Sequence, residues 1–292
     1  MSSIYIKLVL HFFSIWPLPI IHFVASIIGL LFYYLPNDLR RISTINIKLC
    51  FPELNEQEHQ GLLKRSLIET AKSGIELAPT LLWNKKRSLS LVKTVHGLDL
   101  LEDAIKEGNG VIITTPHLGI WEMIGLYCSA NYPTTSMFRP SRIKNMDDFI
   151  RHGRERFGAK LVPTNASGIR TLYKALKNGE LTIMLPDQDP RWGSGVFVPV
   201  FGIQAYSMTL LARLAKKSSA TILFSYAERL ANGKGYTLHF HKATEGCKNP
   251  DSTIATTSIM SGIEDCIRKA PEQYQWSYKR FRTRPTGEKN LY

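Results

Sequence analysis

Short, mostly apolar segments alternate along this chain with longer stretches in which apolar residues recur every three or four positions. Apolar runs bounded by Gly or Pro are typical of strands buried on both faces, and the longer repeat is typical of helices packed on a core. Buried parallel strands are predicted at 111–113 and 181–185. Helices are predicted at 99–106, 118–129 and 168–177. This alternation of strands and helices predicts an α/β fold.

Two further helices and a hairpin complete the predicted fold. Asn55 and Glu58 have the spacing of a capping box, which predicts a helix from there to about residue 78. A last helix is expected over about 251–269. The segments on either side of Asn232-Gly233 are expected to pair as antiparallel strands, because this dipeptide favours a tight turn; they are 221–230 and 235–243. The predicted fold class is therefore a mixed, largely parallel sheet flanked by helices.

The N-terminal part of the chain lacks charge, since no Asp, Glu, Lys or Arg occurs from Leu8 to Asn37. A helix that crosses a bilayer needs about 20 mostly apolar residues. The segment 18–35 is the best candidate, and we expect a hydrophobic membrane-anchoring helix there. The alternatives are a cleaved signal peptide, which the length of the stretch disfavours, and a re-entrant or interfacial helix.

This stretch divides the chain into an anchor at 1–36 and one α/β domain at 37–292. Basic residues follow the stretch closely, whereas Lys7 alone precedes it; those that follow are Arg40, Arg41 and Lys48. Because basic residues concentrate on the cytoplasmic side of membrane helices, the large C-terminal part is expected in the cytoplasm.

His117 and Glu122 stand in a short run directly after the predicted strand 111–113. Open α/β sheets place their chemistry at the carboxyl ends of strands, so the histidine is a candidate general base and the carboxylate its orienting partner. On one continuous helix the two side chains would lie about 140° apart. They can meet only if His117 lies in a loop and Glu122 in the first turns of the helix, and Pro116 and Gly119 suit such a break. The alternative is a histidine that is only structural.

Five further sequence blocks follow in a fixed order. They are Arg139-Pro140, Gly153-Arg154-Glu155-Arg156, Leu185-Pro186-Asp187-Gln188-Asp189-Pro190 and Val196-Phe197-Val198-Pro199-Val200-Phe201-Gly202, with Trp276-Ser277-Tyr278-Lys279-Arg280-Phe281 near the end. Together with the His117 block, this succession resembles the late acyltransferases of lipid A biosynthesis, within the superfamily of glycerolipid acyltransferases that use a His-x4-acid motif. The resemblance extends over nearly the whole chain.

The resemblance implies roles for individual residues. His117 matches the catalytic histidine of the family and Glu122 its carboxylate. Four residues are implied in substrate binding: Arg139, Arg154, Asp187 and Asp189. The stretch 203–209 departs from relatives, which often carry small and Thr-rich residues there, so the acyl chain and acceptor stay open.

The activity implied is transfer of a fatty acyl chain from acyl carrier protein to a hydroxyl of an anionic lipid A precursor, at the cytoplasmic face of a bacterial inner membrane. His117 would take the proton from the hydroxyl as it attacks the thioester, and Glu122 would hold the imidazole in the useful tautomer. Arg154 would bind an anionic group or stabilise the oxyanion. Three alternatives remain: an acyltransferase for a glycerophospholipid or another glycolipid, a membrane-bound thioester hydrolase, and a non-catalytic basic membrane-binding protein.

The formal net charge of +13 requires an anionic partner class. Anionic lipid head groups, a phosphorylated glycolipid and an acidic carrier protein all fit, whereas the basic residues form no recognisable nucleic-acid module. A basic cluster near the C-terminus is predicted as a solvated tail or a membrane-facing segment; it consists of Lys279, Arg280, Arg282 and Arg284.

No metal or other cofactor is expected. Asp187 and Asp189 have an Asp-x-Asp form, but no Walker-type phosphate loop accompanies them. The four cysteines have no CxxC pairing, which favours reduced thiols in a cytosolic compartment; they are Cys50, Cys128, Cys247 and Cys266.

Overall fold

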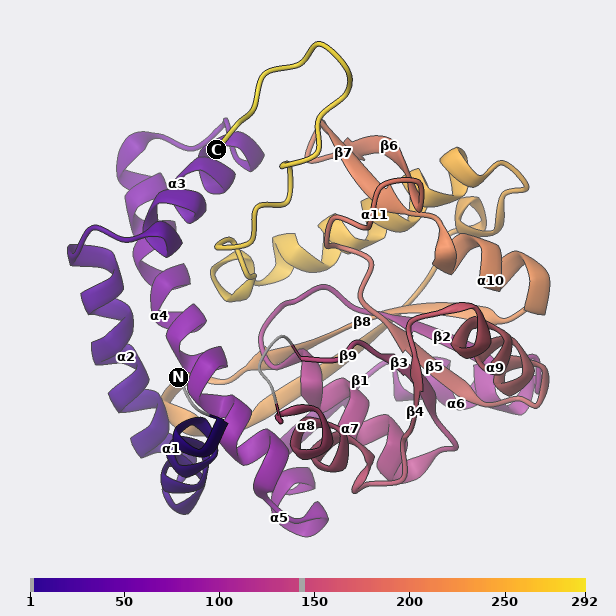
Figure 1. Cartoon of the computed structure of the whole chain (residues 1–292), viewed down its shortest axis with the longest axis horizontal. Coiled ribbons are helices and arrows are strands. Elements are labelled where there is room, and N and C mark those ends of the chain that lie inside the picture. The colour runs from indigo at the N-terminus through magenta and orange to yellow at the C-terminus, as the bar shows by residue number, and fades with distance from the viewer. Residues whose placement is uncertain (1–2, 142–144) are drawn as a thin grey trace.

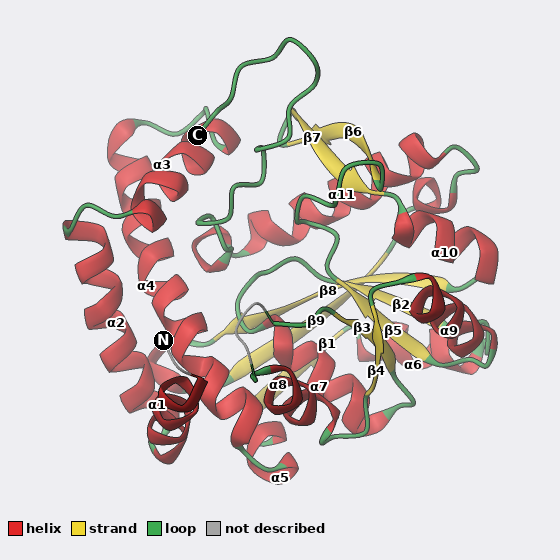
Figure 2. Cartoon of the chain, in the orientation of Figure 1, coloured by secondary structure: helices red, strands yellow, loops and turns green. Residues whose placement is uncertain are grey.

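A five-stranded sheet forms the centre of the protein in a computed structural model that describes residues 3–141 and 145–292 (Figures 1 and 2). Its strand order is β1-β9-β8-β2-β5, and only the pairing of β8 with β9 is antiparallel. The strands are β1 (Val92–His96), β2 (Val111–Thr114), β5 (Leu181–Met184), β8 (Thr221–Arg229) and β9 (Tyr236–Lys242). The predicted mixed, largely parallel sheet is confirmed, and so are its two predicted parallel strands, β2 and β5, and its hairpin.

Two smaller strand pairs adjoin the sheet. β3 (Thr135–Phe138) and β4 (Lys160–Pro163) run parallel, and β6 (Gly195–Val200) and β7 (Ile203–Met208) form an antiparallel hairpin. Phe201 and Gly202 make the turn of this hairpin with positive φ values of 50° and 75°.

Helices cover both faces of the sheet (Figure 1). The helix α11 (Ser252–Lys269) packs on one face against β8, and on the other face α6 (Leu98–Lys106) packs against β9 and α7 (Trp121–Asn131) against β8. On the side of α11, α10 (Leu210–Ser218) packs against α11, and α9 (Ala166–Lys177) packs against α10 and β5. The helix α8 (Asp147–Glu155) packs against β4, and α5 (Lys85–Leu89) lies before β1.

The long helix α4 (Glu56–Leu82) joins the N-terminal helices to the sheet. Its predicted capping box is present, since the Asn55 side chain accepts from the Glu58 backbone and Glu58 accepts from Asn55. The helices packed beside it are α1 (Ser3–Ile15), α2 (Leu18–Tyr34) and α3 (Asp38–Cys50). At the α2–α4 contact a Cβ on Gly29 would lie 2.3 Å from the Cα of Ile68, so only glycine permits this approach.

The predicted apolar helix at 18–35 is present as α2, and its membrane-anchoring role stays a prediction. α2 has 17 residues and α3 follows at an angle of 78°, and within 3–141 and 145–292 no helix by itself has both the length and the apolar character of a span. Taken together, the bent pair α2–α3 meets those requirements. The chain turns because Pro36 cannot continue α2 and Asn37 caps α3.

The outer surfaces of α1 and α2 are strongly apolar. Outside these helices and Leu35, which follows α2, the described residues have only two large apolar side chains in the exposed class, Trp192 and Ile254. The exposed members on α1 and α2 include Tyr5, Leu8, Val9, Phe12, Ile15, Ile20, Phe23, Ile27, Leu31 and Tyr34. Apolar side chains gathered over one surface mark a site of interaction.

Candidate active site

His117 lies in the loop between β2 and α7, three residues after the end of the strand. The helix begins only at Trp121, so Glu122 is in its first turn and the expected break between the two residues is present. Gly119 makes this break possible: its φ is +58°, and a Cβ there would lie 2.0 Å from the Ala227 carbonyl oxygen.

The carboxylate that binds His117 belongs to Asp187, not to Glu122. Asp187 Oδ1 lies 2.8 Å from Nδ1 of the imidazole, and the backbone N–H of His117 donates to Oδ2, also over 2.8 Å. The pairing follows from the sheet, because the last residue of β2, Thr114, is in register with the last residue of β5, Met184. His117 and Asp187 each come three positions after the end of their strand, so the two side chains lie at the same edge of the sheet. The expected contact of Glu122 with the imidazole is therefore corrected, and the substrate-binding role expected of Asp187 stays a prediction.

This contact fixes the state of the imidazole. A carboxylate can only accept, so Nδ1 carries the proton and Nε2 of a neutral His117 is left as an acceptor. The side-chain nitrogen of Gln188 lies 3.3 Å from Nε2. Burial raises the pKa of Asp187, but the facing His117 and the more distant Arg280 outweigh it and hold the pKa below its usual value. Asp187 is thus a buried anion that orients a base.

Glu122 has a different partner, Arg154 of α8. Arg154 Nε donates to Glu122 Oε2 over 3.0 Å, and Nη2 donates to Oε1, which makes a two-bond fork. The charge of Glu122 raises the pKa of Arg154 against the lowering effect of burial. The arginine is therefore a fixed cation, and α7 turns Glu122 toward it rather than toward the imidazole.

Asp189, the second acid of its block, is tied to the C-terminal segment. Its Oδ2 accepts from Arg282 Nε over 2.6 Å and from the Thr283 hydroxyl over 2.7 Å. Its backbone N–H donates to the hydroxyl of Tyr278 over 3.0 Å. Asp189 thus anchors the chain beside the site, although substrate binding was expected of it.

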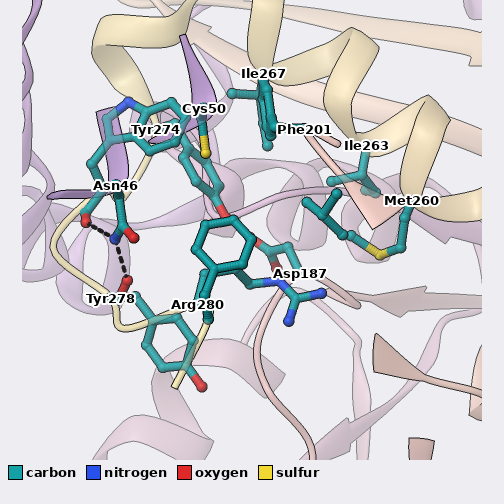
Figure 3. Close-up of a pocket in the computed structure, with 13 residues that line it drawn as sticks. Asn46, Cys50, Asp187, Phe201, Met260, Ile263, Ile267, Tyr274, Tyr278 and Arg280 are labelled. Carbon is teal, nitrogen blue, oxygen red and sulfur yellow. Dashed lines mark hydrogen bonds between the residues drawn. The ribbon is translucent and has the colours of Figure 1, made fainter. Parts of the chain in front are cut away.

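A water-sized cavity of about 10 Å³ lies behind Asp187 (Figure 3). Arg280, whose side chain lines it, is only 5% exposed and donates to the Tyr206 carbonyl over 2.8 Å. The prediction of a solvated or membrane-facing C-terminal cluster is therefore wrong for Arg280, because its guanidinium is inside the protein. Tyr274 lines the same cavity, and burial together with Asp187 raises the pKa of its hydroxyl well above the usual value.

A much larger cavity of about 820 Å³ opens in front of His117, Glu122 and Arg154. One part of its wall is apolar and is made by Leu126, Met137, Leu161, Ile169, Ile183 and Leu210. Another part is lined by arginines and by the Asp189–Arg282 pair; the arginines are Arg139, Arg191 and Arg213. The cavity can therefore hold a molecule with a long apolar part and an anionic part beside the free nitrogen of His117.

The sequence interpretation named most of this site but missed Trp121 and Gln188. The Trp121 ring lies 5.0 Å from that of His117, and Trp121 and Gln188 both line the large cavity. Each adjoins a residue that was singled out, but nothing in the sequence distinguishes a side chain that faces a cavity from one that faces solvent.

The fold and the site define an α/β enzyme with an oriented histidine at the carboxyl end of a parallel strand. Comparison with known sequences identifies its class: residues 2–283 match the family described as bacterial lipid A biosynthesis acyltransferase, and the chain belongs to this family. The enzyme is accordingly an acyltransferase.

Individual relatives support this assignment over most of the chain. The chain is 28% identical over 279 residues to the lipid A biosynthesis lauroyltransferase of Escherichia coli K12, and the match covers 94% of this chain and 90% of the relative. It is 29% identical to the palmitoleoyltransferase of the same organism, with 94% and 89% covered. With the E. coli myristoyltransferase the identity is 25%, with 85% and 77% covered.

Proposed function

We propose that the enzyme transfers a fatty acyl chain from acyl carrier protein to a hydroxyl of a lipid A precursor, with His117 as general base. The observation that carries this role is the orientation of His117: Asp187 holds Nδ1, which leaves Nε2 as the acceptor, and His117 lines the large cavity. Nε2 takes the proton as the hydroxyl oxygen attacks the thioester carbonyl, and an ester bond forms as the carbon–sulfur bond breaks. The imidazolium then returns the proton to the leaving thiolate, so the products are an ester and a free thiol.

Asp187 stabilises the imidazolium that forms during this transfer, since its charge lies 2.8 Å from Nδ1. The Glu122–Arg154 pair supports a different task. Arg154 also lines the cavity and keeps its charge in this pair, which suits stabilisation of the developing oxyanion. Glu122 fixes the direction of the guanidinium and acts on the reaction through Arg154.

The arginines of the cavity support an anionic acceptor. Among the described residues the carboxylates lining it are Glu122, which is paired with Arg154, and Asp189, which is paired with Arg282. Arg139, Arg191 and Arg213 have no ion pair with any described residue. Guanidinium groups bind phosphate through two parallel hydrogen bonds, so these three suit a phosphate on the substrate.

The apolar surfaces of α1 and α2 support membrane association. Apolar helices that lie in the plane of the interface bury one face among the lipid chains, and basic residues nearby add attraction to anionic head groups. We propose that the enzyme binds the cytoplasmic face of the bacterial inner membrane through these two helices. The lipid acceptor would then enter the cavity from the bilayer.

The test is mass spectrometry of the products formed from acyl carrier protein charged with a defined acyl chain and a purified lipid A precursor. Transfer makes the acceptor heavier by one acyl chain, and the His117→Ala variant should lose about 10²- to 10⁴-fold in rate, the usual contribution of a general base. A parallel assay with the same acyl chain on coenzyme A shows which of the two thioesters is the donor.

Free fatty acid without a heavier acceptor would instead identify a hydrolase. If neither a heavier acceptor nor free fatty acid formed, the protein would be a binding protein without catalytic activity. Wild-type turnover in the alanine variant would remove His117 from the mechanism.

A further inference from the structure

A network of buried charges lies beneath the His117 loop and takes no part in the chemistry proposed above. Its centre is Arg229, which ends β8 and is only 4% exposed. Arg229 Nε lies 3.0 Å from both carboxylate oxygens of Glu76, a residue of α4 that is fully buried. Arg229 Nη1 reaches a second carboxylate of α4, Glu69, whose other oxygen accepts from Lys72. Charges of both signs are thus matched inside the protein.

The same guanidinium contacts the backbone of the His117 loop. Arg229 Nη2 donates to the carbonyl oxygen of Gly119 over 3.2 Å and to the Ser73 hydroxyl over 3.1 Å. The Ser73 hydroxyl in turn lies 3.3 Å from the Gly119 oxygen and 3.1 Å from the Glu69 carbonyl oxygen, and it can donate its proton to either. Two donors from different elements therefore converge on a carbonyl only two residues from His117.

The backbone of Arg229 holds the loop from its other side. Gln273 exchanges two hydrogen bonds with the main chain of Arg229, over 2.8 and 3.0 Å, and its own carbonyl accepts from Gly119 over 2.9 Å. Ile120 donates to the carbonyl of Ala227 over 3.1 Å. Gly119 is thus bonded at both its N–H and its carbonyl, in a conformation that leaves no room for a Cβ.

The network also includes the N-terminal helix α2. His22, which is 4% exposed, lies with Nε2 at 2.6 Å from Glu76 Oε1, and the Tyr236 hydroxyl donates to the same oxygen over 3.0 Å. Burial alone would raise the pKa of Glu76, but Arg229 and His22 lower it to about 2, so the carboxylate stays ionised. Because Arg229 Nη2 donates to Glu76 Oε2 as well as to the Gly119 carbonyl, the fixed carboxylate holds the guanidinium beside the His117 loop.

We propose that Arg229 is a positioning residue for the His117 loop, that Glu76 and His22 fix its guanidinium, and that α2 is thereby part of the scaffold of the active site. This inference rests on the role of His117 proposed above. A buried ion pair is weak evidence for stability by itself, because desolvation offsets much of its attraction, whereas a direct contact with the loop explains why this one has its geometry.

The first test is Arg229→Lys, which keeps the charge but cannot bind Glu76 and reach Gly119 together. We expect kcat to fall about 10- to 100-fold with KM nearly unchanged, as for a small misplacement of a reacting group. Hydrogen exchange of the segment 114–122 should become faster at the Gly119 and Ile120 amides. Leu101→Ala is the matched control, since Leu101 is fully buried in α6 away from the loop and its loss lowers the melting temperature without touching Gly119.

The proposal would be overturned if Arg229→Lys and Leu101→Ala, at the same loss of melting temperature, had the same kcat and the same rate of hydrogen exchange at 114–122. Arg229 would then only stabilise the fold. If Arg229→Lys does not fold, Ser73→Ala replaces it, with Thr80→Ala on the same helix as control because the Thr80 hydroxyl bonds only within α4. Ser73→Ala should lower kcat several-fold and speed exchange at 114–122, and no difference from Thr80→Ala in either would overturn the proposal. Exchange requires no turnover, so a wild-type enzyme without transferase activity would refute the proposed function while the exchange result still decides the role of Arg229.

Discussion

Two carboxylates, Asp187 and Glu122, each hold a basic side chain that lines the large cavity, and they bind these side chains in different ways. Asp187, with a side chain only 2% exposed, binds one nitrogen of His117 and the backbone of the same residue. Glu122, with a side chain 13% exposed, binds Arg154 through a two-bond fork. The first pair leaves Nε2 of the imidazole able to accept a proton, and the second leaves a cation that cannot release one. The proposed base and the proposed charge stabiliser therefore belong to two separate pairs.

The comparison also shows why sequence spacing misleads about partners. His117 and Glu122 are five residues apart and belong to one motif, whereas Asp187 is 70 residues away from His117. The sheet decides the pairing, because β2 and β5 are parallel neighbours in register and their carboxyl ends meet at one edge. A motif therefore identifies residues that share a site without identifying which of them are in contact.

The largest effect is expected from Asp187→Asn. Asp187 binds the backbone N–H of His117 with one oxygen and the imidazole Nδ1 with the other. An asparagine has one oxygen and one NH2 group, so its NH2 either faces one of these donors or forces the imidazole into the opposite tautomer. Turnover should fall by as much as about 10⁴-fold, as when the acid of a catalytic triad is replaced by its amide. Single-turnover kinetics with charged acyl carrier protein measures this.

Glu122→Gln provides the comparison for that variant and should lose much less, because His117 keeps its tautomer. If Glu122→Gln were as inactive as Asp187→Asn, the separation into two pairs would be incorrect. Both proteins need matched melting temperatures for the comparison to hold.

The next effect concerns Arg154 and Glu122 as a unit. Arg154→Met and Glu122→Gln should each lower kcat about 10- to 100-fold, and the double variant should be no worse than the more damaged single one. Residues that act as one unit give such non-additive losses in a double-mutant cycle. Additive losses would mean that the two residues act separately, and a rise confined to KM in Arg154→Met would return Arg154 to substrate binding.

Much of the fold could be predicted because its signals are local. The strands 111–113 and 181–185 are apolar since both their faces are buried, and Asn232-Gly233 marks its hairpin by turn chemistry alone. β3 and β4 were not predicted, because four-residue strands with mixed burial carry almost no periodic signal. The length of uncharged sequence before Asp38 predicted a membrane-anchoring helix, but length does not reveal the bend that follows α2.

The candidate site was predictable as a set of residues but not as a geometry. His117, Glu122, Arg154 and Asp187 belong to ordered blocks, and the structure brings all four to one region. Their pairing depends on strand register and on where α7 begins, which no short motif encodes. Arg280 shows the same limit, because a run of basic residues gives no sign that one of them lies under a buried carboxylate.

A smaller effect is expected at the arginines that have no carboxylate partner. Arg213→Ala should raise KM for a phosphorylated acceptor about threefold to tenfold, which corresponds to roughly 1 kcal/mol, with kcat nearly unchanged. Arg170→Ala is the control, since Arg170 is exposed on α9 and does not line the cavity. The Arg213→Ala substitution should leave the Asp187–His117 and Glu122–Arg154 contacts unchanged.

A second arm of this experiment identifies the source of the phosphate. An acceptor without phosphate should abolish the difference between Arg213→Ala and the wild type if the acceptor supplies the anion. If the phosphodiester of the carrier supplies it, KM for the charged carrier rises instead. No rise in either KM would leave Arg213 as a solvated surface residue and remove the anion-binding role.

The smallest effect on the cavity is expected from the exposed apolar side chains of α1 and α2, and the experiment tests whether the two carboxylate pairs are independent of the proposed membrane contact. Ile27 on α2 and Ile254 on α11 are 47% and 51% exposed, so the same substitution by serine removes a similar apolar surface at two places. Binding of half an isoleucine side chain to lipid contributes about 1 kcal/mol, so Ile27→Ser should weaken partitioning into anionic vesicles about fivefold. Ile254→Ser should leave partitioning unchanged, and both variants should turn over detergent-dispersed acceptor at the wild-type rate. An equal loss of partitioning in the two variants would mean that α2 is not the membrane-binding surface, and a loss of turnover in Ile27→Ser alone would mean that α2 affects the His117–Asp187 and Glu122–Arg154 pairs directly.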